Sequence, residues 1–208
     1  MSGRVKKYNE PLSPVTYEEK IKRSVFIADL APVHNEDESK NFLSQIISKY
    51  RDATHNCRAY IFSNGSEYSS DDGEPSGTAG KPILNAIKHS GLVNVMIVVT
   101  RYFGGVKLGT RGLIDAYGMT AAKALEMAEI KECIITQKFF IVLEYSQMGL
   151  ITRLLENNNA INLKWEYNES VSVIADIPVD FCESLTRELE ELFARKIIIS
   201  FDKNLTAL

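Results

Sequence analysis

The residues best suited to chemistry lie in two glycine-rich segments, 71–82 (DDGEPSGTAGKP) and 100–112 (TRYFGGVKLGTRG). Together they hold seven of the twelve glycines. Clustered glycine weakens helices and strands, so it marks backbone that turns sharply or lies close to a ligand. Both segments also carry charged side chains, so the sequence predicts a site in which backbone N–H groups act beside those charges.

The second segment leads into a long helix with one apolar stripe, which we expect over residues 108–128. N–H groups at a helix N-terminus attract anions, and cationic side chains accompany them here. We therefore expect an anion- or RNA-binding surface. Its candidate residues are Arg101, Gly104, Gly105, Lys107, Gly109 and Arg111. The alternative is that the glycines only allow strand and helix to pack closely while the cations lie in solvent.

The first segment is acidic. Its carboxylates can hold magnesium or act as a general acid and base. Acidic residues beside Gly73 and Pro75 more often form turns and helix caps, which is the interpretation we favour. The residues expected to brace this loop are Asp71, Asp72, Glu74, His55 and Lys81. No catalytic residue is predicted.

Neither segment matches a nucleotide-binding motif. A P-loop requires glycine where Pro75 stands and a hydroxyl residue where Pro82 stands. A dinucleotide fingerprint ending at Gly112 requires glycine in place of Lys107. The sequence therefore predicts no cofactor.

Metal and disulfide sites are not expected either. His55 and Cys57 lie on one face of a predicted strand, but two ligands do not make a metal site. The three cysteines are odd in number and form no CxxC pair, which fits neither a disulfide framework nor structural zinc. We expect free thiols and no bound metal.

The composition is that of an ordinary globular protein of 208 residues, with 45% hydrophobic and 25% charged residues. A net charge of -3 excludes a protein that coats nucleic acid with its whole surface, so polyanion contact must be local. No apolar run is long enough to span a bilayer, and the N-terminus has no apolar signal region. We expect a cytoplasmic protein without membrane contact; the sequence leaves its oligomeric state open.

The pattern up to residue 134 predicts a first domain that contains both glycine segments. An irregular arm leads to an extended stretch at 15–23. Strands are then expected at 24–33, 55–63, 67–70 and 92–100, and helices from 36, from 82 to 91 and at 108–128. The strand at 92–100 is almost continuously apolar, which indicates burial on both faces.

Residues 135–208 predict a second domain. Strands are expected at 137–145, 160–167, 171–179 and 196–202, with helices at 147–156 and 181–193. The order βαββαβ is the ferredoxin-like arrangement. The fold class is therefore α+β with two domains, 1–134 and 135–208.

Three sequence motifs resemble the signatures of the IMPACT/YigZ family: DATHNCRAY from Asp52, DDGEPSGTAGKP from Asp71, and VTRYFGGVKLGTRGLIDAYG from Val99. The resemblance covers roughly residues 17–130. The tail is similar to the additional C-terminal domain of bacterial YigZ-type members.

This resemblance implies a first domain like domain 2 of ribosomal protein S5 and a ferredoxin-like second domain like domain V of elongation factor G. Eukaryotic relatives regulate translation during amino-acid starvation by competing for the activator of an initiation-factor kinase, through an additional N-terminal domain. The 208 residues contain no such domain, so that partner is not carried over. Association with RNA, the ribosome or translation factors is what the resemblance implies.

One departure from the family pattern concerns a candidate cation. The family often reads LGxGGLVRAY where this chain has LGTRGLIDAY, with Arg111 and Asp115. These residues are four apart on one helix face, so we expect an ion pair that leaves Arg111 less free to bind phosphate.

The hypothesis from the sequence is a translation-associated, non-enzymatic protein that binds RNA or the ribosome through the glycine-rich surface. One alternative is a nucleotide- or phosphate-dependent enzyme that uses the glycine loop, with Asp71 and Asp72 holding magnesium. The other is a protein-binding adaptor.

Overall fold

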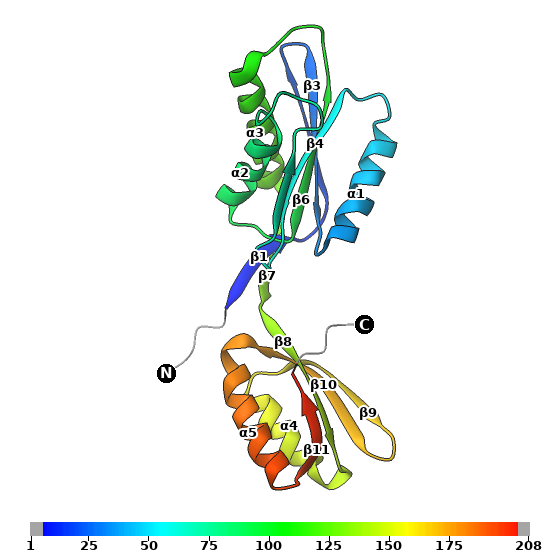
Figure 1. Ribbon diagram of the computed structural model, residues 1–208, viewed down its shortest axis with the longest axis vertical. Helices are drawn as coiled ribbons and strands as arrows, with labels where there is room; N and C mark the ends of the chain where they lie inside the picture. Colours follow the sequence, from blue (N-terminus) through cyan, green and yellow to red (C-terminus); the bar gives the residue numbers. More distant parts are fainter. Residues whose placement is uncertain (1–5, 204–208) are drawn as a thin grey trace. The chain divides into compact units, whose positions relative to one another are not determined.

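The computed structural model describes residues 6–203 and divides them into two compact units. Tyr8–Cys133 forms the N-terminal unit, and residues 134–203 belong to the C-terminal unit with Lys6 and Lys7. Each unit has its own sheet and its own hydrophobic core. The predicted two-domain α+β class is confirmed (Figure 1).

The N-terminal unit is built on a five-stranded sheet in the order β2-β3-β6-β4-β5, and its neighbouring strands are antiparallel. Helices α2 and α3 cover one face of this sheet, and α1 covers part of the other (Figure 1). The bounds are β2 Val15–Ile21, β3 Ser24–Pro32, α1 Glu36–Lys49, β4 His55–Ile61, β5 Glu67–Ser70, α2 Gly80–Ser90, β6 Val95–Tyr102 and α3 Gly109–Met127.

Strand β6 is central and buried on both faces, as its apolar sequence predicts. Ile97 and Val99 pack in the core beneath α2 and α3, whereas Met96 and Val98 pack in the core beneath α1. Successive side chains of a strand point to opposite faces, so two helical layers require an apolar residue at every position.

The sequence pattern does not predict a two-stranded ribbon of β1 Lys7–Pro11 and β7 Ile130–Ile134. The first of these strands falls where an irregular arm is expected. Both strands are short, and neither sequence shows the alternation of apolar and polar residues that marks a half-buried strand.

The C-terminal unit has the predicted βαββαβ order and a sheet ordered β11-β8-β10-β9. Its helices bury Ile151 and Leu155 of α4 and Leu185 and Leu189 of α5 against that sheet. The bounds are β8 Thr136–Leu143, η1 Tyr145–Gln147, α4 Met148–Asn157, β9 Ile161–Tyr167, β10 Val171–Pro178, η2 Val179–Phe181, α5 Cys182–Ala194 and β11 Ile198–Asp202. In residues 6–203 no helix combines the length and the apolar character that crossing a membrane requires.

Candidate anion-binding surface and its buried support

The loop between β6 and α3 lies against the tip of the β2–β3 hairpin, and Gly104 makes that approach possible. A Cβ atom on Gly104 would lie 1.9 Å from the backbone oxygen of Arg23. The Gly104 N–H also donates to the Ser24 Oγ at 3.3 Å. Only glycine permits such contact, so this position ties the hairpin to the second glycine segment.

The hairpin tip consists of two cationic residues with left-handed backbone. Lys22 has φ 44° and Arg23 has φ 71°, while Ile21 and Ser24 pair across the turn. Two-residue hairpins that need positive φ at both positions usually carry Asn-Gly or similar residues. Lysine and arginine are disfavoured there, so nothing in the local sequence predicts this turn. Both residues are exposed beside the loop.

The start of α3 combines an N-cap residue without a capping side chain with two exposed cations. Leu108 precedes the helix without a capping side chain, and the first turn contains no acidic residue. Lys107 and Arg111 are exposed, and Gly105 and Gly109 adopt positive φ values of 80° and 73°. Uncapped N–H groups at a helix start favour an anion.

The predicted pair between Arg111 and Asp115 is present, with 3.8 Å between Nε and Oδ2. The Arg111 side chain is nevertheless 94% exposed. An ion pair in that setting contributes little, about 0.3–0.5 kcal/mol on a helix surface, so it does not prevent Arg111 from meeting a phosphate.

Arg101 lies in the interior, apart from the exposed cations. Its Nη1 is 2.5 Å from the Glu74 Oε1, and its side chain is only 6% exposed. The guanidinium carbon lies over the rings of Phe26 and Phe103, at 5.5 and 5.3 Å from their centroids. The structure therefore gives this arginine internal partners and places its charge beneath the loop rather than on the surface.

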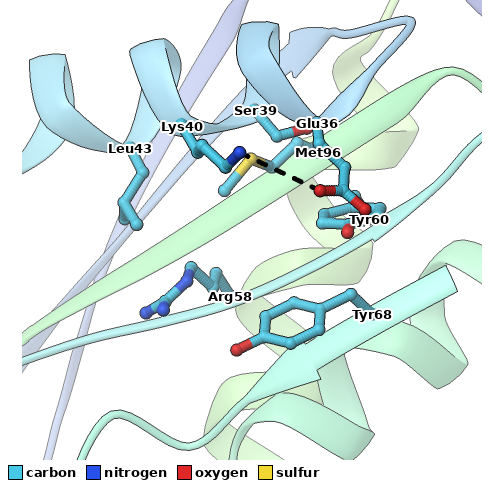
Figure 2. Close-up of a pocket in the computed structure, with 8 residues that line it drawn as sticks. All are labelled: Glu36, Ser39, Lys40, Leu43, Arg58, Tyr60, Tyr68 and Met96. Carbon is cyan, nitrogen blue, oxygen red and sulfur yellow. Dashed lines mark ion pairs between the residues drawn. The ribbon is translucent and has the colours of Figure 1, made fainter.

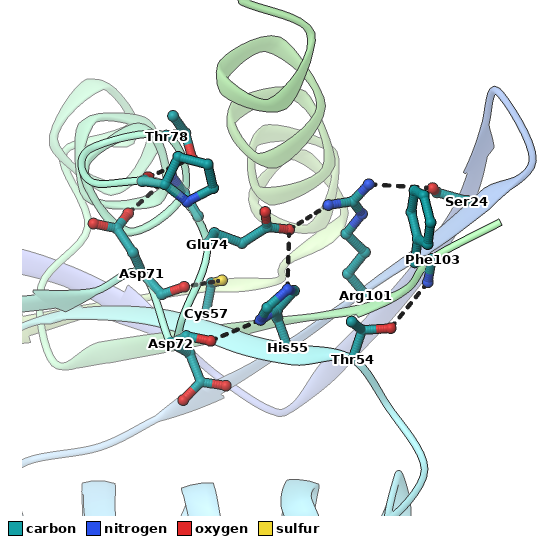
Figure 3. A network of polar contacts seen from close by, with 12 residues as sticks. Ser24, Thr54, His55, Cys57, Asp71, Asp72, Glu74, Thr78, Arg101 and Phe103 are labelled. Carbon is teal, nitrogen blue, oxygen red and sulfur yellow. Dashed lines mark hydrogen bonds and ion pairs between the residues drawn. The ribbon is translucent and has the colours of Figure 1, made fainter. Parts of the chain in front are cut away.

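Glu74 is the centre of a buried polar network. Besides Arg101, its Oε1 accepts a hydrogen bond from the Tyr117 hydroxyl at 2.8 Å and lies 3.9 Å from the His55 Nε2. Burial raises the pKa of Tyr117 well above its ordinary value, so the hydroxyl remains a donor. The His55 Nδ1 donates to the Asp72 carbonyl at 2.8 Å (Figure 3). These contacts tie the first glycine segment to β4, β6 and α3.

Asp71 caps helix α2 from a distance. Its Oδ2 accepts from the Gly77 N–H at 2.8 Å, and its Oδ1 accepts from the N–H groups of Ala79 and Gly80 at 3.0 and 2.8 Å. Ala79 itself supplies no capping side chain. Burial acts to raise the pKa of Asp71, but the three N–H donors outweigh it and the pKa is lowered.

The other two residues expected to brace the first glycine segment are Asp72 and Lys81. The Asp72 Oδ2 accepts from the Asn56 N–H at 2.7 Å, and Lys81 is exposed in the first turn of α2. Cys57 donates its Sγ hydrogen to the Asp71 carbonyl at 2.9 Å, and burial raises the pKa of this thiol to about 12. Across residues 6–203 no three His, Cys, Asp or Glu side chains gather as a metal site would require.

We predict that Asp71→Asn destabilises the N-terminal unit by about 1 kcal/mol at neutral pH, as loss of a helix cap does. Because the folded pKa is lowered, the carboxylate stabilises the fold above its unfolded pKa of about 3.9. This contribution disappears as the pH falls through the lower folded value. Urea unfolding across pH should therefore show the wild-type and variant curves converging below about pH 4.

Asp37→Asn serves as the matched control, since that aspartate is 89% exposed. It should change stability by less than about 0.5 kcal/mol. A difference between wild type and Asp71→Asn that is unchanged down to pH 2 would contradict the capping role.

Sequence reasoning missed Lys22, Arg23 and Tyr117 as contributors. In the sequence Tyr117 is one member of an apolar helix stripe, and its hydroxyl partner lies 43 residues away. Lys22 and Arg23 carry no turn signal at all. The positive charge of the hairpin is the one local indication of its role.

Comparison with known proteins assigns both units. The profile of the Impact N-terminal domain matches residues 22–125, which include both glycine segments, and that of a domain of unknown function (DUF1949) matches residues 141–194.

An "IMPACT family member" of Haemophilus influenzae is 33% identical over 196 residues, covering 92% of this chain and 95% of that protein. The "IMPACT family member YigZ" of Escherichia coli is 34% identical over 172 residues, 81% and 84% of the two chains. A solved structure titled as a hypothetical protein is 30% identical, covers 98% of this chain and 100% of its own, and superposes with a TM-score of 0.71.

Proposed function

This chain belongs to the IMPACT family, and from that premise we propose that it is a translation-associated regulatory protein that binds RNA or the ribosome. The binding face is the basic surface, defined here as Lys22, Arg23, Lys107 and Arg111 with the backbone N–H groups of Gly105 and Gly109. The Gly104 N–H, also expected to bind phosphate, donates instead to the Ser24 Oγ. Arg101 acts in this proposal as the buried support of the loop.

The observation that carries the proposal is the contact of Gly104 with the Arg23 backbone. It places the hairpin tip that carries Lys22 and Arg23 against the loop that leads to Lys107 and Arg111. The chain as a whole has a charge of -3, so exposed cations on these two neighbouring segments concentrate positive charge on an acidic protein. Local clusters of this kind supply phosphate contacts without coating the whole surface.

The contacts of the acidic loop favour this proposal over a nucleotide-dependent enzyme. Asp71 and Asp72, the carboxylates that would hold magnesium, already accept hydrogen bonds from backbone N–H groups. Both oxygens of Asp71 accept such bonds, and the second oxygen of Asp72 lies 3.7 Å from the Arg58 Nη1. Glu74 is likewise paired with Arg101 and Tyr117. A protein-binding adaptor remains the outcome if RNA and ribosomes are not bound.

The test is filter binding to a structured RNA and cosedimentation with ribosomes at several salt concentrations. We expect affinity that falls with salt. For Arg23→Ala/Lys107→Ala the salt slope should decrease by about 2, since each removed cation leaves one phosphate without its partner. Lys164→Ala, an exposed lysine of the C-terminal sheet, is the matched control and should leave the slope unchanged. Absence of RNA affinity and of ribosome cosedimentation at low salt would overturn the proposal.

A further inference from the structure

A separate pocket of about 300 Å³ opens between α1 and the β4–β5 hairpin. Its walls include Glu36 and Lys40 of α1, Arg58 and Tyr60 of β4, and Tyr68 of β5 (Figure 2). This is the sheet face opposite to α2 and α3, and the basic surface at the start of α3 is not part of it. The volume is near the lower end of the range for small-ligand sites, about 300–1,000 Å³.

One wall of the pocket is a row of parallel aromatic rings. Tyr60 and Tyr68 are paired across β4 and β5, with ring centroids 5.5 Å apart and planes inclined by 23°. Phe62, just after β4, stacks on the other side of Tyr60 at 4.5 Å and 18°. Phe62 is buried, whereas Tyr68 is 42% exposed. The row therefore ends in an accessible ring held in a fixed orientation by its neighbours.

Charged groups surround that ring. The Arg58 guanidinium carbon is 5.9 Å from the Tyr68 centroid, and its Nη1 is 3.7 Å from the Asp72 Oδ1. The Lys40 Nζ is 3.9 Å from the Glu36 Oε2 (Figure 2). Lys40 also donates to the Asp37 Oδ1 at 3.3 Å, at an exposed position. The Arg58–Asp72 and Lys40–Glu36 separations exceed hydrogen-bond distance, so Arg58 and Glu36 are loosely paired and can exchange partners with a ligand.

Glu36 is directed toward the aromatic wall. Burial first, and then the negative charge of Glu36, raise the pKa of the Tyr60 hydroxyl, and Figure 2 shows that carboxylate on the Tyr60 side of the pocket. The Glu36 side chain is 70% exposed, so its oxygens are open to a ligand. The pocket thus combines a stacking ring, two cations and one carboxylate acceptor.

We propose that this pocket binds one guanine nucleotide, with the base stacked on Tyr68 beside Arg58. Single bases are recognised by stacking on aromatic rings or arginine planes and by hydrogen bonds to their Watson–Crick edge. Glu36 can accept from N1–H and the 2-amino group of guanine, which lie side by side on that edge. Adenine lacks this donor pair. Arg58 supplies positive charge for the phosphate.

The site is independent of the proposed function, because none of its residues belongs to the basic surface. The same ligand chemistry occurs in a free nucleotide and in a guanine within single-stranded RNA. Two probes separate these sources: guanosine monophosphate alone, and a short single-stranded oligonucleotide with one central guanine. Binding of either probe supports the site, and the tighter one identifies the source.

The experiment is calorimetric titration of the full chain with each probe and with its adenine counterpart. We expect the guanine probe to bind more tightly. Tyr68→Ala should weaken binding about 10-fold, while Tyr68→Phe, which keeps the ring, should bind as wild type does. Glu36→Gln should reduce the preference for guanine over adenine. Tyr68 lies on an edge strand and is partly exposed, so a thermal unfolding scan is expected to show Tyr68→Ala folded.

Lys107→Ala should leave these titrations unchanged, which distinguishes failure of this site from failure of the basic surface. No binding of either guanine probe, or equal affinity in wild type and Tyr68→Ala, would overturn the site. Equal affinity for guanine and adenine probes would overturn the assignment of Glu36 to the guanine edge.

Discussion

Glu74→Ala should lower the free energy of unfolding of the N-terminal unit by about 3–5 kcal/mol, the usual effect of removing one partner of a buried ion pair. The variant leaves the Arg101 guanidinium buried without its carboxylate, at 6% side-chain exposure. Hydrogen exchange of the β6 amides reports this change directly, since that strand is the centre of the N-terminal sheet.

Two further variants separate the charge effect from the loss of packing. Tyr117→Phe removes one hydrogen bond to Glu74 and should destabilise by about 1 kcal/mol. Glu74→Leu/Arg101→Met removes both charges and should be substantially more stable than Glu74→Ala, because no isolated charge remains. If Glu74→Ala destabilised no more than Tyr117→Phe, the network around Glu74 would not be what holds the loop.

The helices and strands that the sequence predicts well are those whose apolar residues recur at a regular helical or strand spacing. Strand β6 and helix α3 can be located because each has a long, regular apolar pattern. The predicted ends of an element are wrong where a side chain distant in sequence fixes the residue at which the element begins. The expected strand at 92–100 actually begins at Val95, because Asn94 adopts φ 51° and its side chain is bonded to Glu10 and Ser63. Helix α2 begins two residues before the expected Pro82, since Asp71 caps it from outside the helix.

In the candidate site, too, local sequence features are predictable and long-range contacts are not. Glycine clustering locates both loops, but it cannot separate exposed cations from buried ones. Arg101 and Lys107 look alike in sequence, yet only Arg101 meets a carboxylate, 27 residues upstream, and two aromatic rings. Long-range partners of this kind leave no local periodicity. The positions of Lys22 and Arg23 beside the loop likewise depend on the close approach of Gly104.

Gly104→Ala should destabilise the N-terminal unit by about 2–4 kcal/mol, in the range of overpacked core positions. The new Cβ would lie 1.9 Å from the Arg23 oxygen and 2.2 Å from its carbonyl carbon. Both atoms are backbone, so a side-chain rotation cannot relieve the clash. The β2–β3 hairpin or the β6–α3 loop must move. Urea unfolding gives the stability, and amide shifts of Lys22, Arg23 and Gly105 report the displacement.

Two glycine variants serve as controls for Gly104→Ala. Gly105→Ala adds a methyl group at φ 80° with no atom within 4 Å, so it should cost about 1–2 kcal/mol from backbone strain alone. Gly149→Ala in α4 has neither a positive φ nor a neighbour within 4 Å, and should raise stability by up to about 1 kcal/mol.

Gly104→Ala also tests the basic surface without changing any charge. If the hairpin cations act together with Lys107 and Arg111, moving the hairpin away from α3 separates groups that must meet their phosphates at the same time. RNA affinity should then fall about 10-fold in Gly104→Ala, comparable to removing one well-placed RNA-binding side chain, and less in Gly105→Ala. If RNA contacted another part of the protein, wild type, Gly104→Ala and Gly105→Ala would bind it equally, and that result would contradict the role of the Gly104–Arg23 contact.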